Sequence, residues 1–296
     1  MKVRIGFGGG ARGGADRVAQ FAELVDRLEA DGFDSLWCSE RATGPMPDPI
    51  VALTFAAGRT RSLKLGTSVQ VLPGRNPVLL AKQWASLDVL SGGRALPAFG
   101  LGVVDAGEQQ AFGVTREERA ALFDEALPLV RRLWDEETVD HDGPRFHYEG
   151  ASIGLRPPHR LDVWLGGRVP AELRRVGRLA DGWLPSFCTP EQVARDRKVV
   201  DEAASAVGRT IDPEHYGAMV FYTRGELPAA YARMMAERRG VDVGEVVVTG
   251  LDALRDRMQE FVGVGFSKLV AVPVHEVTSW ADELASLADA VLDLQT

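Results

Sequence analysis

The chain has 296 residues, of which 45% are hydrophobic and 26% charged, and its formal net charge is −8. These values are typical of a globular chain with a sizeable core, and they exclude wholesale disorder. The acidic balance, with no Lys/Arg-rich run, makes nucleic acid and an anionic membrane poor candidates for a partner. We expect no signal peptide and no membrane span, because no long apolar stretch is present.

The chain contains two cysteines, Cys38 and Cys188. They cannot build a disulfide framework, and they suit the reducing cytoplasm, where we expect the protein to reside. The five histidines are scattered without metal-ligand spacing, so we expect no metal site.

The first half of the chain is predicted to hold four strand–helix pairs. In chain order these are strand 3–7, helix 17–30, strand 33–38, helix 49–59, strand 64–69, helix 77–90, strand 95–100 and helix 116–134. Gly32 ends the first helix and Pro77 suits the first turn of the third. Pro128 predicts a kink in the fourth helix.

Residues 139–160 interrupt this rhythm. Residues 139–148 resemble a β-hairpin with an Asp-Gly turn at Asp142-Gly143. The alternation then resumes. The remaining predicted elements are strand 162–166, helix 170–180, strand 182–186, helix 190–207, strand 216–222, helix 228–239, a possible short strand 246–249, helix 251–263, strand 267–272 and helix 279–294.

Eight strand–helix units favour an α/β fold with a parallel sheet that closes into a (β/α)8 TIM barrel. We expect residues 1–296 to form one such domain, with the segment around 139–160 as a small insertion. An open, doubly wound sheet is the alternative. In a barrel the site lies on the loops that follow the strands, at their carboxyl ends.

Several of these loops carry polar or glycine-rich segments. Glu40-Arg41 follows the second strand, and it is either part of a site or a rim ion pair. Gly100 and Gly102 follow the fourth strand, and their bare backbone would let a flat ligand approach.

Gly166-Gly167 leads into a helix after the fifth strand, which is a plausible phosphate seat with Arg168, Arg174 and Arg175 nearby. The alternative interpretation is a tight turn followed by a helix whose basic face is exposed to solvent. Three aromatic residues at strand ends either line a pocket or belong to the core: Trp37, Phe99 and Trp183.

These rim segments, in this order, resemble the luciferase-like monooxygenase superfamily of flavin- and deazaflavin-dependent barrels, and within it the actinobacterial branch that uses coenzyme F420. The segments that carry the resemblance are Phe33-Asp34-Ser35-Leu36-Trp37, Asp48-Pro49, Leu65-Gly66-Thr67-Ser68-Val69, Asn76-Pro77, Leu90-Ser91-Gly92-Gly93-Arg94, Ala111-Phe112-Gly113, Trp164-Leu165-Gly166-Gly167 and Ala180-Asp181-Gly182-Trp183.

The resemblance implies a cofactor site across the second to sixth strands. It places a non-prolyl cis peptide at Ser68–Val69, bulging toward the deazaflavin ring, and it makes Thr67 a neighbour of that ring. The loop from Gly100 to Asp105, with Gly102 and Val103, would run beside the ring. Gly166 and Gly167 would offer N–H groups to the phosphate tail, with Arg168 and Trp183 close by.

The sequence departs from the family pattern after the second strand, where many relatives carry an acid followed by His. Here Glu40 matches the acid and Arg41 replaces the histidine. Arg stays protonated and cannot act as a general base near neutral pH, but it could bind an anionic substrate group or stabilise developing negative charge. Asp105 matches a position where some relatives keep a catalytic Glu, so a proton-transfer role is the hypothesis.

The loop Leu101-Gly102-Val103-Val104 is uncharged, whereas flavin mononucleotide (FMN)-dependent relatives tend to place a phosphate-binding Arg there. This favours F420 over FMN. We therefore expect an oxidoreductase that transfers a hydride between reduced F420 and a small organic substrate. The alternatives are an FMN-dependent two-component monooxygenase that uses oxygen, and a non-catalytic flavin-binding barrel. Family resemblance further suggests a homodimer.

Overall fold

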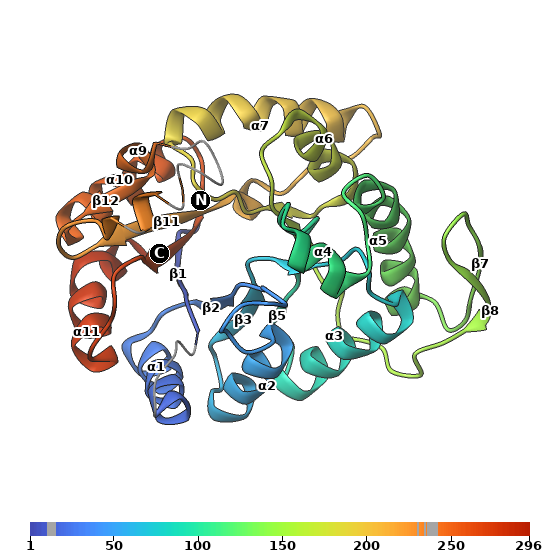
Figure 1. Ribbon diagram of the computed structural model, residues 1–296, viewed down its shortest axis with the longest axis horizontal. Helices are drawn as coiled ribbons and strands as arrows, with labels where there is room; N and C mark the ends of the chain where they lie inside the picture. The colour runs from blue at the N-terminus through green and yellow to red at the C-terminus, as the bar shows by residue number, and fades with distance from the viewer. Residues whose placement is uncertain (11–15, 230, 234, 236–241) are drawn as a thin grey trace.

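Strands and covering helices alternate along the chain as the sequence predicts (Figure 1). The computed structural model describes residues 1–10, 16–229, 231–233, 235 and 242–296. The strands of the barrel are β1 (Arg4–Gly8), β2 (Ser35–Cys38), β3 (Lys64–Thr67) with β4 (Gln70–Val71), β5 (Ala95–Leu96) with β6 (Ala98–Gly100), β9 (Trp164–Leu165), β10 (Gly182–Trp183), β11 (Gly217–Thr223) and β13 (Lys268–Pro273).

The helices form the outer layer around these strands, except α4, which lies inside the ring of helices (Figure 1). They are α1 (Arg17–Asp31), α2 (Pro49–Arg59), α3 (Pro77–Ser91), α4 (Ala106–Phe112), α5 (Arg119–Asp135), α6 (Pro170–Leu179), α7 (Pro190–Ser205), α9 (Val243–Val246), α10 (Leu251–Gly263) and α11 (Trp280–Val291), with short 3-10 turns at Pro213–His215 and Leu292–Leu294. Asp48 and Asn76 cap α2 and α3, each followed by a proline in the first turn.

Parallel pairing can be followed round the whole barrel. One ladder runs β11-β13-β1-β2-β3-β5, and a second runs β4-β6-β9-β10. Along the chain β3 is followed by β4 and β5 by β6, so these two strand pairs connect the ladders on one side. On the other side a parallel bridge between Trp183 and Tyr216 joins β10 to the start of β11. The chain is therefore an α/β barrel, as predicted. A short strand, β12 (Val247–Thr249), pairs with the end of β11.

The hairpin is also confirmed. Strands β7 (Val139–Asp142) and β8 (His147–Ala151) pair antiparallel, and the hairpin projects from the side of the barrel beyond α5 (Figure 1). Pro128 lies inside α5, as the sequence indicates. Two short helices, α4 and α9, were not predicted. Of the predicted helix 228–239, residues 229, 231–233 and 235 are helical, and residues 230, 234 and 236–239 lie outside the described residues.

Two tryptophans fill the barrel interior. Trp37 on β2 and Trp164 on β9 are buried and meet edge to face, with ring centroids 6.2 Å apart. Their rings lie over glycines of adjacent strands: a Cβ on Gly66 would come within 2.4 Å of the Trp37 ring, and one on Gly182 within 2.5 Å of the Trp164 ring. Large and small residues on neighbouring strands thus fill the interior together.

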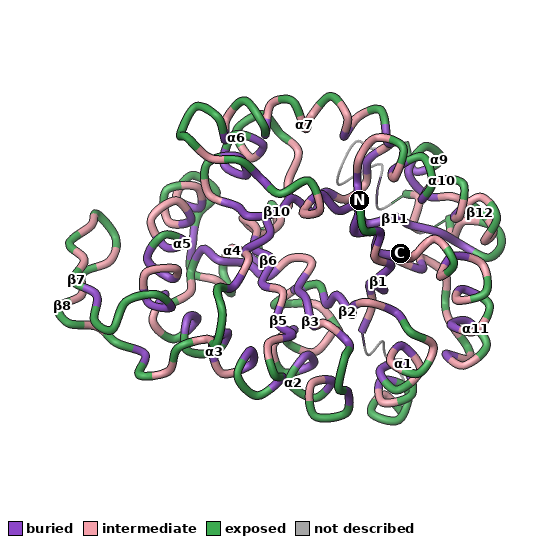
Figure 2. Tube along the Cα trace, turned by 180° about the vertical axis from the view of Figure 1, so that it is seen from behind, coloured by how far each residue is buried: buried purple, intermediate pink, exposed green. Residues whose placement is uncertain are grey.

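The buried residues concentrate on the strands and on the helix sides that face them (Figure 2). At the amino ends of the strands the floor of the barrel is charged. The buried Lys268 ammonium pairs with Asp34, which also pairs with Lys64 at 3.1 Å. Burial alone would raise the pKa of Asp34, but the two ammonium groups outweigh it and hold that pKa below its usual value.

Replacing Gly66 with Ala should destabilise the protein by about 1–3 kcal/mol, because the new methyl group would overlap the Trp37 ring. Gly58→Ala in α2 is the matched control, since a Cβ there meets nothing within 4 Å and Ala favours a helix by about 0.5–1 kcal/mol. Urea denaturation of both variants checks this. Equal midpoints for the two variants would contradict the packing described above.

Candidate functional site

The peptide bond between Ser68 and Val69 is cis, as the family resemblance implies. It lies between β3 and β4, at the carboxyl ends of the strands. Backbone and side-chain hydrogen bonds from the β2 loop hold it: Ser68 N donates to Cys38 O at 2.9 Å, and Ser39 Oγ donates to Ser68 O at 2.9 Å. The end of β2 and the β3–β4 junction therefore form one unit of the rim.

Glycines from two neighbouring strands surround the Val69 side chain. A Cβ on Gly100 would lie 2.5 Å from Val69 Cγ2, and one on Gly166 would lie 3.2 Å from Val69 Cγ1. The sites predicted on β3, β6 and β9 are thus brought together by packing around one partly exposed side chain. Thr67 lies beneath them: it is buried, and its hydroxyl donates to Ala98 O at 2.7 Å.

The loop after β6 leaves the barrel through Gly102, whose φ of 79° favours glycine. The Arg119 guanidinium donates to Gly102 O at 2.8 Å and fixes this bend, and Val103 follows it, partly exposed. Asp105 then caps α4, its Oδ1 accepting from Gly107 N at 3.0 Å and Glu108 N at 3.2 Å. The Asp105 carboxylate thus begins a helix, a role that the sequence-based hypothesis did not include.

Glu40 forms a buried ion pair at the same rim. One carboxylate oxygen pairs with the Arg75 guanidinium, and the other accepts from Val71 N at 2.7 Å. Arg75 also donates to Val71 O at 2.8 Å, so the pair clamps β4 against the end of β2. Burial raises the pKa of Glu40, and the Arg75 charge and the Val71 N–H oppose that rise.

Arg41 points to a second buried acid. Its Nε lies 3.4 Å from Oε1 of Glu108, which is 3% exposed. Glu108 also accepts from Thr43 N at 2.9 Å and Ala42 N at 3.1 Å, which binds the loop after β2 to α4. Burial would raise the pKa of Glu108, but the hydrogen bonds from Thr43 and Ala42 outweigh it, so the pKa lies below its usual value.

The chain's own carboxylate occupies much of the predicted phosphate seat. Glu172 Oε2 accepts from Arg168 N at 2.9 Å and from Val169 N at 3.2 Å, at the N-terminus of α6. Gly167 has a φ of 97°, and its carbonyl accepts from Trp183 Nε1 at 3.0 Å. A phosphate bound here would compete with Glu172 for the two N–H groups.

Two of the three arginines near that turn form ion pairs with other residues. The Arg168 guanidinium pairs with Asp196 at 2.9 Å, and Arg175 pairs with Asp124 at 2.5 Å, whereas Arg174 is exposed. The aromatic residues Trp37, Phe99 and Trp183 are fully buried, so they belong to the core that supports the rim.

Sequence reasoning missed several residues of this rim, among them Arg75 and Glu108. Glu108 stands three residues after Asp105, the spacing of a helix start, so the sequence held a signal for it. Arg75 lies in a turn-rich loop 35 residues from Glu40. Arg75 meets Glu40 only because β2 and β3 are neighbours in the sheet, and a local sequence pattern does not predict which strands are neighbours.

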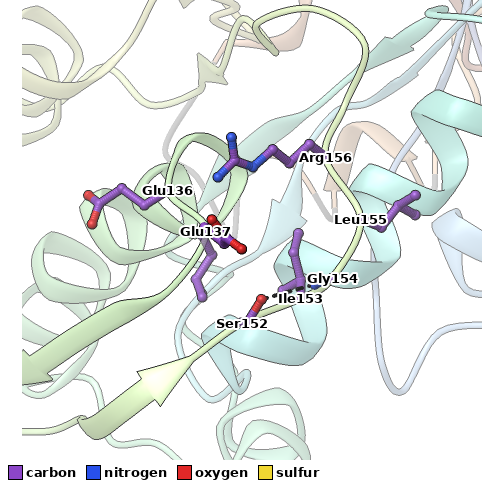
Figure 3. Close-up of a pocket in the computed structure, with 8 residues that line it drawn as sticks. Glu136, Glu137, Ser152, Ile153, Gly154, Leu155 and Arg156 are labelled. Atoms are coloured by element: carbon purple, nitrogen blue, oxygen red, sulfur yellow. Dashed lines mark hydrogen bonds between the residues drawn. The ribbon is translucent and has the colours of Figure 1, made fainter.

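A pocket of about 350 Å³ lies elsewhere, between the C-terminal end of α5 and the segment after β8 (Figure 3). Its lining consists of Leu133, Glu136, Glu137, Ser152, Ile153, Gly154, Leu155 and Arg156. Helices of a barrel end near the amino ends of the strands, so this pocket is remote from the rim.

Two features are absent from the part of the chain that the structure describes. None of its helices has the length and apolar character needed to cross a bilayer. Its His, Cys, Asp and Glu side chains form no group of three that could hold a metal ion.

Solved structures share this fold across the whole chain. An F420-dependent secondary alcohol dehydrogenase, solved with an F420–acetone adduct, superposes with a TM-score of 0.84, covers 100% of both chains and is 17% identical. The F420-dependent tetrahydromethanopterin reductase of Methanopyrus kandleri gives a TM-score of 0.81 at 19% identity, again over 100% of both chains. At these identities the likeness shows the fold alone.

Curated relatives are closer in sequence. An F420-dependent glucose-6-phosphate dehydrogenase of Kineococcus radiotolerans is 31% identical over 187 residues, which are 59% of this chain and 55% of that protein. A phthiodiolone/phenolphthiodiolone dimycocerosates ketoreductase of Mycobacterium sp. (strain JLS) is 36% identical over 211 residues, 66% of this chain and 54% of that protein. The chain thus matches about half the length of these relatives. The sequence profile described as luciferase-like monooxygenase matches residues 2–268, and the chain belongs to this family.

Proposed function

We propose that the protein is an oxidoreductase that transfers a hydride between reduced coenzyme F420 and a small organic substrate. Family membership supports a flavin-type cofactor, and relatives at 31% and 33% identity are named as F420-dependent dehydrogenases. The uncharged loop Leu101-Gly102-Val103-Val104 favours F420 over FMN.

The observation that carries the proposal is the cradle around Val69. Gly100 and Gly166 both lack the Cβ that would collide with or press on the Val69 side chain, so Val69 packs directly against the backbone of two other strand ends. Such a surface suits a flat ring system. When bound there, F420 supplies the hydride chemistry, and the protein supplies position and electrostatics.

The polar residues of the rim divide into anchors and candidates for contact with substrate. Glu40 and Arg75 hold the β2 and β4 ends together. Glu108 holds the loop that carries Arg41, whose side chain is 35% exposed. Glu40 has both roles in our proposal: its carboxylate anchors β4, and it faces the reacting carbon together with Arg41 and Asp105. Arg41 would stabilise negative charge as a permanent cation.

The phosphate tail of the cofactor is proposed to lie at the Gly166-Gly167 turn, near Arg168. Glu172 would have to release the Arg168 and Val169 N–H groups for this contact. Two further proposals come from composition. The buried, free thiols of Cys38 and Cys188 support a reducing cytoplasm, and the net charge of −8 supports a small molecule rather than nucleic acid as partner.

We also propose a homodimer. Five of the exposed large apolar side chains lie on the neighbouring helices α2 and α3, a concentration that favours association: Val51, Phe55, Leu79, Val89 and Leu90. Light scattering at micromolar protein should give a mass about twice 32.1 kDa, and Val51→Glu combined with Leu79→Glu should return it to that of one chain. A wild-type mass of one chain would contradict the proposal.

Titration of the purified protein with F420 and, separately, with FMN tests the cofactor. We expect micromolar binding of F420 with quenching of its fluorescence, and much weaker binding of FMN, because residues 101–104 after β6 are uncharged and the nearby Arg119 guanidinium is engaged by the carbonyls of Leu101 and Gly102. Tight FMN binding without F420 binding would favour the oxygen-consuming monooxygenase. Tight F420 binding with no turnover of any donor or acceptor would favour a non-catalytic carrier.

Asp105→Asn tests proton transfer without removing the helix cap, since Asn caps as well as Asp. If Asp105 transfers the proton, turnover should fall about 100-fold or more while the melting temperature stays unchanged. Asp212→Asn is the matched control, because Asp212 caps the 3-10 turn Pro213–His215 at the other end of the barrel. Unchanged turnover in Asp105→Asn would remove Asp105 from the mechanism.

A further inference from the structure

Phe187, in the loop after β10, has a φ of 53°. This is the left-handed region, which residues other than glycine seldom occupy, so the surrounding structure must hold it there. The Arg168 guanidinium does so: it donates to Phe187 O at 3.3 Å and is itself fixed by Asp196 at 2.9 Å. The arginine predicted to attract a phosphate therefore positions an aromatic residue.

The Phe187 ring stacks on Phe221 of β11, with centroids 4.0 Å apart and planes 13° from parallel. Phe221 is one of the inward residues of β11, and Met219 is another. Met219 reaches toward β1, two strands away in the same ladder: a Cβ on Gly8 of β1 would lie 3.5 Å from Met219 and 2.7 Å from Val272 of the intervening β13. Apolar side chains of β11 and β13 therefore pack close to the backbone of β1 at Gly8.

These apolar side chains adjoin the proposed cofactor site around Val69. Phe187, Phe221, Met219 and Val272 belong to the same apolar cluster as Val69. Phe187 and Val272 are partly exposed, as Val69 is. The rim over β10–β13 therefore carries an apolar patch of Phe187, Phe221 and Val272 beside the Arg224–Glu283 ion pair, and this patch adjoins Val69.

Several cations of the described rim are already paired. One arginine soon after each of β2, β4, β9 and β11 pairs with a carboxylate: Arg41 with Glu108, Arg75 with Glu40, Arg168 with Asp196, and Arg224 with Glu283. An anionic substrate group that recruited one of these cations would leave a largely buried carboxylate without its partner, which is unfavourable.

We propose that the substrate is an uncharged carbonyl compound, or the corresponding alcohol, whose apolar body packs against Phe187 and Val272. Phe187 is a specificity-determining residue, and Arg168 with Asp196 are positioning residues. This inference rests on the proposed function: in the reducing direction a hydride from reduced F420 reaches the carbonyl carbon, a proton reaches the oxygen, and oxidised F420 is released.

Binding of a matched pair of ketones tests the proposal without needing turnover. The probes are 4-methylcyclohexanone and 4-oxocyclohexanecarboxylate, which differ mainly in charge, and saturation-transfer NMR with the full chain measures both affinities. We expect the neutral ketone to bind about tenfold or more tightly than the carboxylate. Equal or tighter binding of the carboxylate, or no binding of either probe, overturns the proposal.

Phe187→Asn should weaken binding of the neutral ketone by about tenfold, because Asn accepts a left-handed backbone but lacks the ring. Val272→Thr keeps the shape of Val and adds a polar group, so it should act in the same direction. Phe146→Asn in the hairpin is the control and should bind like the wild type. Wild-type affinity in both rim variants also overturns the proposal. A failed F420 titration would refute the cofactor proposal and leave these binding results standing.

Discussion

The packing of Trp37 and Trp164 across the barrel is the constraint on which the rest of the structure depends. Two indole rings can share the interior of a narrow barrel only if the strands beside them carry no side chain, and Gly66 and Gly182 meet that requirement. The interior is then solid, and ligands can approach only at the ends. Because parallel strands bring all their carboxyl ends to one side, the loops after β2, β4, β6 and β9 must share that side.

The chain's own carboxylates organise this rim. Glu40, Glu108 and Glu172 each accept hydrogen bonds from backbone N–H groups, and the first two also pair with arginines. The consequence is that hydrogen bonds and ion pairs hold the loops after β2, β4 and β9 in place. The remaining chemistry of the rim lies in backbone surfaces around Val69 and in the apolar side chains over β10–β13.

Much of the fold could be predicted because strand length, helix periodicity and glycine or proline at helix ends are local signals. The cis bond at Ser68–Val69 followed from family resemblance. The predicted roles of Arg168 and Asp105 were incomplete for a different reason. Asp196 lies 28 residues from Arg168, and a seven-residue helix begins at Ala106, so the partners of both side chains are set by tertiary contacts or by an element too short for periodicity to reveal.

The charged floor around Asp34 and Lys268 has an evolutionary consequence. Loss of Asp34 would leave the buried Lys268 ammonium without this carboxylate partner, whereas loss of Lys268 leaves Asp34 paired with Lys64, so Asp34 is the more constrained of the two positions. The rim loops have no such coupling to the floor, because the tryptophan layer separates them. Substrate specificity can therefore change through substitutions in loops such as the one that carries Phe187, while the ion pairs at the amino ends of the strands stay the same.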